Sequence, residues 1–425
     1  MIDRRPFTGN SKLKILLVSQ SAHPDVSATA QLTWDLAKYL QKKGHLVTLI
    51  ASRSLYGSCG AVLPSREQID GVNLIRVGAS LFGKASIIAR AMDFGLFYLC
   101  IAFRVFFLPR QDVSVWLSTP PFIALLGWLL RVVRGTPFVY WLMDLYPDVA
   151  VACGVLRVNG IAAKLLDSLN RFCLRAADHV VVLGRCMEAM IVDKGIPKDR
   201  ITSINVWSAA DTVAEEPGAG GDYRQAWGVG DRLLVMYAGN FGLGHDMLTI
   251  AASVVELAKD PRIVFAFVGS GKRKAELLQA VSAGESSQVI DAPFQPRELL
   301  GKLLGSADVH LISMSAEVKG MLVPSKLYGV LAAGKPALFV GPADSEVGLV
   351  ISESGCGTTV ANGDEAGLTA AIRAYANERE RVVREGVNGQ NAYAARWNAL
   401  AAMARWEALL EAVGRGSSSA DSAEA

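Results

Sequence analysis

The sequence predicts an α/β protein made of two doubly wound lobes that face a cleft. Three observations predict this fold class. Short apolar runs alternate with helical patterns through both halves of the chain, and a stretch rich in glycine and charge separates the halves. A chain of 425 residues is also too long for one ordinary core and suits two domains.

The first half begins with a βαβ unit. Residues 13–19 are the first expected strand, residues 27–43 a helix in which leucines recur every four positions, and residues 46–51 the second strand. Strands of a parallel sheet are covered on both faces, so they appear as short continuous apolar runs, and such runs continue along this half. The further expected strands are residues 74–77, 113–118, 138–143 and 179–183, and the expected helices are residues 85–108, 122–133 and 161–176.

The alternation stops at the sequence DTVAEEPGAGGDYRQAWGVGD, which predicts a linker, and restarts with expected strands at 233–238, 263–268, 309–313 and 337–340. The helical spacing of Trp397, Leu400, Met403, Trp406 and Leu410 predicts a packed last helix. The expected divisions are a tail at 1–11, a first lobe at 12–208, a linker at 209–231, a second lobe at 232–390, the last helix at 391–413 and a disordered tail at 414–425.

Composition excludes several classes of protein. The 43 Lys and Arg against 40 Asp and Glu give a net charge of +3, which argues against a dedicated nucleic-acid binder. The six cysteines form no CxxC pair, so neither a zinc site nor a disulfide framework is indicated, and we expect small buried hydrophobes in a reduced compartment. The N-terminus lacks the pattern of a secretory signal, so a cytoplasmic protein is expected. The best candidate span, residues 94–108, is too short and contains Arg104, so no transmembrane helix is predicted.

The sequence LVPSKLYGVLAAGKP, residues 322–336, is the first candidate site. A turn with Pro324, Ser325 and Lys326 opens into an apolar helix that ends at Gly334. Helix N-termini carry unpaired N–H groups, and a lysine there adds a full charge, so a phosphate would suit this place. A capped core helix with a solvated lysine is the alternative, and it stays open.

Two glycine turns follow expected strands of the same half. Residues 239–244 read GNFGLG after one strand, and residues 269–272 read GSGK after the next. Glycines let backbone N–H groups approach a diphosphate, and Lys272 or Arg273 would add charge. Ordinary tight turns are the alternative. Neither turn fits the nicotinamide-binding GxGxxG pattern with its acidic residue, and GxxxxGK[ST] is absent, so a P-loop is excluded.

These motifs together resemble a known family. The segments YAGNFG, FVGSGKRKAEL and VPSKLYGVLAAGKP, with QSAHPDVSATAQLTWDLAKYLQKKGHLVTLI and MDLYPDVAVACGVL, are similar to retaining nucleotide-sugar glycosyltransferases of family 4, over about residues 12–412. The most similar members build bacterial O-antigen, capsule and colanic acid. The resemblance implies a GT-B fold of two Rossmann-like lobes, with an acceptor-binding lobe at 12–208, a nucleotide-sugar-binding lobe at 232–390 and a last helix that crosses back to the first lobe.

The resemblance also implies donor contacts in the second half. It places Gly239, Asn240 and Gly242 near the donor diphosphate and Lys326 on a phosphate oxygen. The turn beside the donor sugar would contain Met321, Val323, Pro324 and Ser325. The second glycine turn would contribute Gly269, Gly271 and Lys272. His245, next to the first glycine turn, is expected to face the donor.

The chain departs from the family at two positions. Many relatives carry glutamates that contact the sugar and the ribose, where this chain has Met321 and Gly329. Glu346, after the next strand, is the expected substitute, and a solvated loop acid is its alternative reading. In the first half, Met143 stands where many relatives have a histidine, beside Asp144. Asp144 could orient the acceptor hydroxyl or accept its proton, or it could cap the following turn.

The acceptor side of the cleft is expected at the loop of residues 21–29, with His23, Ser27 and Ala28. The chemistry implied is transfer of a glycosyl group to a hydroxyl, with positive groups stabilising the departing diphosphate. No DxD signature is present, so no metal and no cofactor are expected, and no histidine shows metal-ligand spacing.

Aromatic and basic residues suggest contact with a membrane surface. Residues 85–110 combine five phenylalanines with Arg90, Arg104 and Arg110, and Arg131 and Arg134 end the next expected helix. A lipid-linked acceptor at the inner face of the cytoplasmic membrane would explain this composition, and a buried helix with basic ends is the alternative. Two other functions stay open: a nucleotide-sugar 2-epimerase and a non-catalytic GT-B binding subunit.

Overall fold

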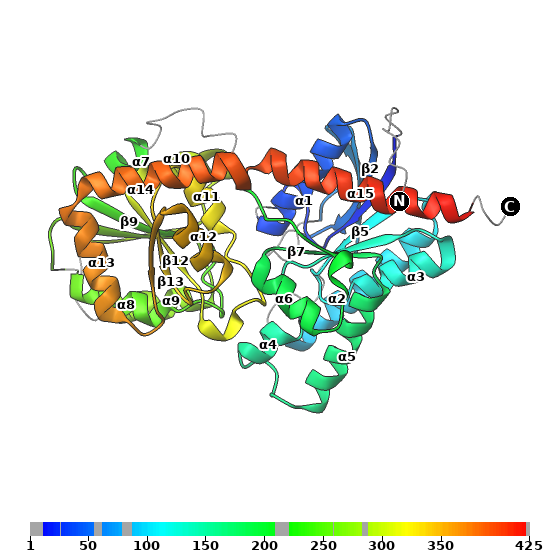
Figure 1. Ribbon diagram of the computed structural model, residues 1–425, viewed down its shortest axis with the longest axis horizontal. Helices are drawn as coiled ribbons and strands as arrows, with labels where there is room; N and C mark the ends of the chain where they lie inside the picture. Colours follow the sequence, from blue (N-terminus) through cyan, green and yellow to red (C-terminus); the bar gives the residue numbers. More distant parts are fainter. Residues whose placement is uncertain are drawn as a thin grey trace, which may run out of the picture. The chain divides into compact units, whose positions relative to one another are not determined.

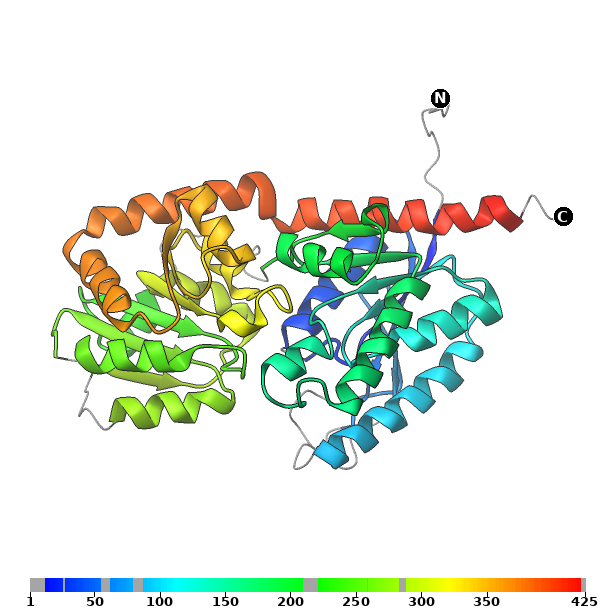
Figure 2. The ribbon, with the colours of Figure 1, turned by 60° about the horizontal axis from the view of Figure 1, so that its bottom comes forward.

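The computed structural model describes residues 12–25, 27–54, 62–78, 87–208, 221–257, 259–282 and 288–421. The chain divides into two compact units (Figures 1 and 2). Unit 1 contains Met1–Trp141, Cys173–Val180 and Trp406–Ala425, and unit 2 contains Leu142–Phe172 and Val181–Arg405. The lobe boundaries expected from the sequence stay predictions.

The first sheet has eight strands in the order β3-β4-β2-β1-β5-β6-β7-β8. Strand β1 lies between β2 and β5, so Ile15 pairs with Val47 on one side and Val113 on the other, both in parallel. All the strands expected in this half are confirmed, and β3 and β8 were not expected. The bounds are β1 Lys14–Val18, β2 Leu46–Ser52, β3 Arg66–Ile69, β4 Val72–Val77, β5 Val113–Leu117, β6 Phe138–Trp141, β7 His179–Val182 and β8 Ile201–Ser203.

Four helices of this half lie where the periodicity predicts them, and the short helices at Asp148–Ala152 and Arg185–Asp193 were not expected. In α1 the spacing of four brings Leu32, Leu36 and Leu40 onto one buried face, and Gly44, with φ of +94°, then lets the chain turn into β2. The helices of this half are α1 Ala28–Lys42, α2 Ile87–Phe106, α3 Ala124–Arg134, α4 Asp148–Ala152, α5 Ile161–Ala176 and α6 Arg185–Asp193.

The second sheet has six strands in the order β11-β10-β9-β12-β13-β14, and all its neighbouring pairs are parallel. The switch between β9 and β12 makes the strand order reverse there, as in an open doubly wound sheet. The bounds are β9 Leu233–Ala238, β10 Ile263–Val268, β11 Val289–Ala292, β12 Val309–Ser313, β13 Ala337–Val340 and β14 Gly357–Val360.

Side chains of this sheet alternate between two cores. Val235 and Phe265 pack with residues of α8, α9 and α13 on one face, while Met236 and Ala266 pack with Leu303 of α10 on the other. The sheet is therefore covered on both faces, which confirms the predicted α/β fold class. The helices are α7 Gly221–Ala226, α8 Met247–Leu257, α9 Lys272–Ser282, α10 Leu300–Ser306, α11 Lys326–Ala332, α12 Glu346–Ser354, α13 Glu365–Asn377, α14 Arg379–Ala392 and α15 Ala399–Asp421.

Part of the expected linker is helical. Residues 209–220 lie outside the described residues, but α7 occupies the stretch that follows them. Arg224 holds this helix to unit 2, because its guanidinium donates to Asp308 at 3.0 Å and to the Ser306 carbonyl at 3.1 Å. The linker prediction is wrong for residues 221–226, since it missed a partner 84 positions away.

The expected last helix is interrupted. A π-helical turn at Tyr393–Trp397 ends α14, and Asn398 then caps α15 by accepting a hydrogen bond from Ala401 N at 2.9 Å. In unit 1, Trp406 of α15 packs on Trp141 of β6, with ring centroids 4.6 Å apart. The helix continues to Asp421, so the expected disorder is wrong for residues 414–421, where Arg415 pairs with Glu411 at 3.3 Å.

Two further expectations concern single residues and membrane spans. Cys173 and Cys356 are buried as expected, whereas Cys100, Cys153 and Cys186 are half-buried, and Cys59 lies outside the described residues. Within the described residues, none of the helices combines the length and the apolar character that crossing a bilayer requires.

Candidate functional site

The two glycine turns of unit 2 lie against each other. Strands β9 and β10 pair in register, with Ala238 beside Val268, so both turns emerge at the same sheet edge. A Cβ on Gly269 would lie 2.1 Å from the Gly239 carbonyl oxygen, and one on Gly271 would lie 2.4 Å from the Phe241 oxygen. Gly269 and Gly271 also have φ of +123° and +152°, so these positions require glycine.

This packing uses part of the backbone that a ligand would need. Gly239 N donates to the Val268 carbonyl at 2.9 Å, and Gly269 N donates to the Ala292 carbonyl at 2.9 Å. Their glycine character is therefore explained by the fit of one turn on the other. A donor contact at Gly239, Gly269 and Gly271 stays a prediction.

Lys326 reaches the first glycine turn from α11. Its Nζ lies 3.4 Å from the centroid of the Tyr237 ring, and a Cβ on Gly239 would be 3.6 Å from the same atom. The Nζ atom is buried and has no hydrogen-bond partner within the described residues. Burial lowers the pKa of Lys326 well below its ordinary value. The alternative of a solvated lysine is therefore wrong.

His245 lies beside this lysine in a fixed tautomer. Its Nδ1 is 2.6 Å from the Ser313 carbonyl oxygen, which can only accept, so Nδ1 carries the proton and Nε2 carries a lone pair. Burial lowers the pKa of His245 to about 3, and the charge of Arg273 and the charge that Lys326 has when protonated act in the same direction. The ring is neutral at ordinary pH.

The first turn brings three expected residues together. A Cβ on Gly242 would lie 3.2 Å from Asn240 Nδ2 and 3.7 Å from His245 Nε2. Asn240 is exposed, while Gly242 and His245 are half-buried. Asn240, Gly242 and His245 therefore lie together at the first turn. Their role in binding the donor stays a prediction.

The cations after β10 have different positions. Arg273 donates to the His245 carbonyl at 3.0 Å, which fixes it beside the first turn. Lys274 Nζ donates to the carbonyl oxygens of Gly269 at 2.7 Å and Ala292 at 2.8 Å, so it stabilises the second turn. Lys272 is exposed, and among the described residues its side chain makes no hydrogen bond to either turn. Its donor role stays a prediction, and Arg273 is the better placed of the two residues named from the sequence.

A cavity of about 430 Å³ opens beside the first turn within unit 2. Asp246 in its wall is already engaged, because it accepts hydrogen bonds from Thr249 N at 3.1 Å and Asn362 Nδ2 at 3.0 Å. The carboxylate of Glu317 is exposed and makes no hydrogen bond or ion pair with the described part of the chain. The lining residues are Ala152, Cys153, Leu243, Asp246, Arg273, Ser315, Glu317, Val318 and Asn362.

The sequence interpretation missed most of this wall. Ser315 and Glu317 follow β12, and Asn362 follows β14, so they lie at the carboxyl ends of strands, where ligands of open α/β sheets bind. That rule was the available signal. The turns at Ser315 and Asn362 carry no glycine or lysine motif, so only their position after a strand marks them.

The turn before α11 contacts the segment after β6. Leu145 N donates to the Met321 carbonyl at 2.8 Å, which places Asp144 next to this turn inside unit 2. Val323 and Pro324 are buried, and Ser325 is half-buried directly before α11. The structure therefore brings Asp144 and the turn at Met321 close together, as a single site would require.

Asp144 is the most perturbed acid of this region. Burial raises the pKa of Asp144 to about 6. Burial is the main cause that raises the pKa of Cys153, which lines the cavity, and the charge of Asp144 raises it further. Asp144 therefore lies near that wall, and its catalytic role stays a prediction.

Glu346 is a buried acid that pairs with Arg185. It is 8% exposed and begins α12, so the reading as a solvated loop acid is wrong. Its carboxylate accepts hydrogen bonds from Arg185 N at 2.7 Å, Nε at 3.3 Å and Nη2 at 3.2 Å. It does not line the cavity. These bonds occupy the oxygens that a donor hydroxyl would need, and they weigh against the predicted donor role.

The missing glutamate at Gly329 has a steric explanation. A Cβ there would lie 3.2 Å from Ser208 Oγ and 3.3 Å from Leu304 Cδ1. Gly329 is buried within α11, so a longer side chain would have to displace these neighbours.

The residues expected on the acceptor side gather at the start of α1 in unit 1. The His23 ring stacks on Trp34 with centroids 4.9 Å apart, and its carbonyl accepts from Arg76 at 2.8 Å. Ser27 precedes α1 and its Oγ is buried without a hydrogen bond among the described residues, while Ala28 is exposed. Their acceptor role stays a prediction.

One group of possible metal ligands comes together among the described residues, His45 with Glu407 and Glu411 in unit 1. His45 Nδ1 accepts from Leu13 N at 3.2 Å, so the neutral ring carries its proton on Nε2, the atom 3.5 Å from Glu407. That proton occupies the position a metal would need. Glu407 also accepts from Tyr39 at 2.9 Å, so the group is better explained by hydrogen bonding.

Helices α2 and α3 expose an apolar face in unit 1. Leu99 is 72% exposed and Phe103 70% exposed on α2, and Val132 is exposed on α3. The reading of 85–108 as a buried helix is wrong for these side chains; residues 85 and 86 lie outside the described residues. The other exposed apolar residues of this face are Met92, Phe106, Phe107, Trp128, Leu129 and Val133.

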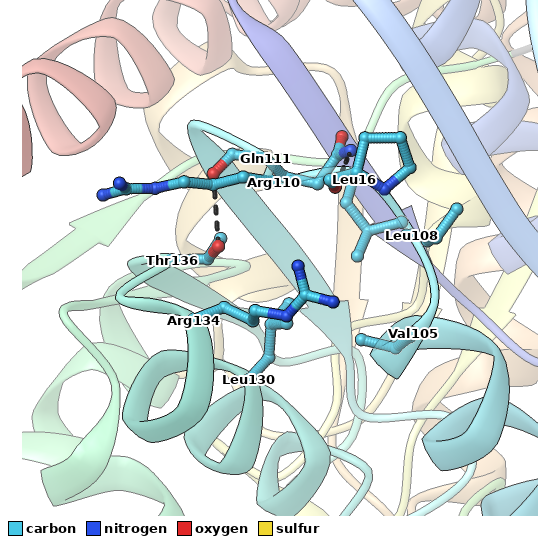
Figure 3. A pocket seen from close by; sticks show the side chains of 9 residues that line it. Leu16, Val105, Leu108, Arg110, Gln111, Leu130, Arg134 and Thr136 are labelled. Carbon is cyan, nitrogen blue, oxygen red and sulfur yellow. Dashed lines mark hydrogen bonds between the residues drawn. The ribbon is translucent and has the colours of Figure 1, made fainter.

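Basic residues border this apolar face. Arg110 and Arg131 are exposed, although Arg131 also pairs with Asp178 at 2.9 Å. Figure 3 shows Arg110 and Arg134 beside a small pocket of about 10 Å³, where Thr136 donates to the Gln111 carbonyl. Such a volume holds no more than one water, so this pocket is no ligand site.

Comparison with known proteins supports an enzymatic activity for the chain. Residues 28–207 match the Glycosyl transferase 4-like domain. The chain is 27% identical to the probable glycosyltransferase WbjE of Pseudomonas aeruginosa over 263 residues, 62% of this chain and 66% of that protein. It is 23% identical over 347 residues to the putative colanic acid biosynthesis glycosyl transferase WcaI of Escherichia coli, 79% of this chain and 85% of that protein. This chain is a glycosyltransferase.

A solved structure supports the fold of this glycosyltransferase. Anabaena HepE, determined in complex with UDP, superimposes with a TM-score of 0.68 at 13% identity and covers 94% of this chain and 100% of its own. The glycosyltransferase thus has the two-lobed GT-B architecture that the resemblance implied.

Proposed function

We propose that this glycosyltransferase uses a nucleoside diphosphate sugar and binds the diphosphate between Lys326 and the turn at Gly239 and Gly242. The observation that carries the proposal is the buried Lys326 Nζ atom, which has no hydrogen-bond partner among the described residues and lies beside a turn without side chains. Such an atom needs an anion to compensate its burial. HepE, which shares the fold, was solved with UDP-glucose, and this supports the class of donor.

The proposed reaction breaks the bond between the sugar C1 atom and the diphosphate oxygen and forms a bond from C1 to an acceptor hydroxyl oxygen. The hydroxyl proton goes to a base, for which Asp144 is the candidate, since it is charged above its pKa of about 6. Lys326 and Arg273 stabilise the negative charge on the departing diphosphate. Two cations near one turn support a metal-independent reaction. Retention of configuration is proposed from the resemblance alone.

The cavity beside the turn is the proposed place of the hydroxyl-rich part of a substrate. Glu317 offers a carboxylate without a partner among the described residues, and Ser315 and Asn362 offer neutral polar groups in the same wall. Leu243 and Val318 supply the apolar surface that the faces of a sugar ring pack on. Glu317 thus replaces Glu346 as the candidate acid for substrate hydroxyls.

The proposed acceptor is lipid-linked or polysaccharide and belongs to bacterial cell-surface polysaccharide synthesis. WcaI is named for colanic acid biosynthesis, which supports this class. We also propose peripheral binding at the cytoplasmic face of the membrane. The exposed apolar face of α2 and α3 with Arg110 and Arg131 supports it.

Release of nucleoside diphosphate from UDP-, GDP- and dTDP-sugars, with and without bacterial lipid extract, tests the proposal. We expect release from one donor, stimulated by the extract, and lost on Lys326→Ala. Lys335→Ala is the matched control, since Lys335 is a half-buried lysine just after α11. Conversion of a free nucleotide sugar without release would support the epimerase, and binding without release would support a non-catalytic subunit.

A further inference from the structure

The site around Lys326 offers the lysine no hydrogen-bond acceptor of its own among the described residues. An ammonium group has three N–H donors, and Lys326 Nζ is buried with no acceptor among the described residues. The Tyr237 ring face, 3.4 Å away, attracts a cation more weakly than the water that burial removes. A neutral amine fits this empty environment better than an ammonium.

The groups that face Lys326 do not restore the charge. Tyr237 of β9 presents its ring, His245 presents a neutral imidazole, and His310 of β12 donates from Nε2 to the Leu304 carbonyl, 2.9 Å away. Lys326 contributes to lowering the pKa of both histidines, so all three lie within electrostatic reach of one another. No carboxylate within the described residues forms an ion pair with Lys326. The charge fixed beside the first turn is another cation, Arg273 of α9, which donates to the His245 carbonyl.

We propose that a nucleoside diphosphate enters this site together with a proton, which converts the Lys326 amine to an ammonium. The proton comes from solvent, and the phosphate oxygens become the acceptors for the new N–H groups. The inference rests on the proposed function, because it assumes that the diphosphate binds beside Lys326. It adds that donor affinity depends on pH through this lysine and falls as the pH rises.

The sign of the dependence follows from linkage. The burial that depresses the pKa of Lys326 applies to the empty protein, and a bound anion raises that pKa. Between the two pKa values, each nucleotide that binds takes up as much as one proton, and the dissociation constant rises as much as tenfold per pH unit. The second phosphate ionisation of the ligand lies near pH 6, and the nucleotide bases ionise only above about pH 9, so the nucleotide itself does not titrate in a window of pH 7.5–8.5. His245, with a pKa of about 3, stays neutral in this window.

Calorimetric titration of the full chain with UDP, and with GDP and dTDP in parallel, measures this uptake. At pH 8.5 the binding enthalpy is compared in Tris and EPPS, two buffers with different enthalpies of ionisation. We expect uptake of up to one proton in the wild type and unchanged uptake in Lys335→Met. Lys326→Arg keeps its charge at every pH tested, so it binds without uptake. Circular dichroism confirms that each variant is folded.

Each outcome separates the two proposals. Binding of a nucleotide with equal enthalpy in both buffers and a constant affinity from pH 7.5 to 8.5 overturns the proton uptake and leaves the nucleotide site intact. Uptake that persists in Lys326→Arg also overturns it, because another group then takes the proton. Failure of all three nucleotides to bind at any pH overturns the proposed function and this inference with it.

Discussion

At Asp144, burial of one carboxyl group sets the pH at which the proposed base is charged. Its pKa is raised to about 6 by desolvation, so the fraction that can accept a proton increases up to that pH. We expect kcat/KM to rise about tenfold per pH unit below pH 6 and to level off above it. Asp144→Asn should lower kcat by about 10²- to 10⁴-fold, measured by release of nucleoside diphosphate.

Asp148→Asn is the control for this prediction. Asp148 is a nearby acid at the start of α4, and its carboxylate already pairs with Lys194 at 2.9 Å. An activity profile that is flat from pH 5 to 8 in the wild type would contradict a role for Asp144 in the charged form. Equal loss in both variants would point to structural damage instead.

The same shift predicts a pH dependence of stability. A carboxyl whose folded-state pKa is about 6, against an ordinary value of 3.8, binds its proton more tightly in the folded protein. The stabilisation is complete below about pH 3.8 and is lost as the pH rises through 6, by about 3 kcal/mol at most. Urea unfolding of the full chain at pH 5 and 7 should show about 1 kcal/mol of this loss in the wild type, and Asp144→Asn should remove it.

Glu346 allows a structural role to be separated from a donor role. Its carboxylate accepts three hydrogen bonds from Arg185, and one of them satisfies the first backbone N–H of α6. Removing it leaves charged donors without partners, so Glu346→Ala should lower the free energy of unfolding by about 1–3 kcal/mol. In Glu346→Ala, the affinity for the sugar donor relative to the affinity for UDP should be the same as in the wild type. A selective loss of sugar-donor binding would instead restore the donor role that the sequence suggested.

At the scale of elements, the glycine turns behave as one packed unit. A methyl group at Gly271 would meet the backbone of Phe241 at 2.4 Å, and backbone cannot move aside as a side chain can. Gly271→Ala should therefore lower the free energy of unfolding by about 2–4 kcal/mol and weaken nucleotide binding at least tenfold. Gly305→Ala in α10 is the matched control, since nothing lies within 4 Å of its Cβ position and alanine favours helices. Equal nucleotide binding by the two variants would show that the nucleotide site does not depend on close packing of the two glycine turns.

The sequence predicted elements whose signal is local and missed those that depend on distant partners. Strands such as β9 and β10 are continuous apolar runs, and a buried parallel sheet requires that composition. Strand β3, with the sequence REQI, is an exposed antiparallel edge that exists because it pairs with β4. Helix α7 depends in the same way on Arg224 binding to Asp308.

The candidate site shows the same limit across unit 2 as a whole. Carboxyl ends of strands meet at one edge of a sheet, so the sequence could place Gly239, His245 and Lys326 in one region. It could not choose between Lys272 and Arg273, because adjacent residues at a helix start point in different directions. It also could not foresee that Glu346 pairs with Arg185, since no local pattern marks a partner 161 positions away.

For the molecule as a whole, the unexplained surface is the apolar face of α2 and α3. Leu99 and Phe103 lie one helical turn apart and are both more than two-thirds exposed, with Arg110 and Arg131 nearby. Inserting this face into a bilayer removes aromatic surface from water, and arginines add attraction to anionic lipid. Replacing both apolar residues, as Leu99→Glu with Phe103→Glu, should lower co-sedimentation with phosphatidylglycerol vesicles at least tenfold. Leu400→Glu, at an equally exposed site on α15, is the control. Unchanged binding of the double variant to these vesicles would show that the membrane contact, if one exists, lies elsewhere on the chain.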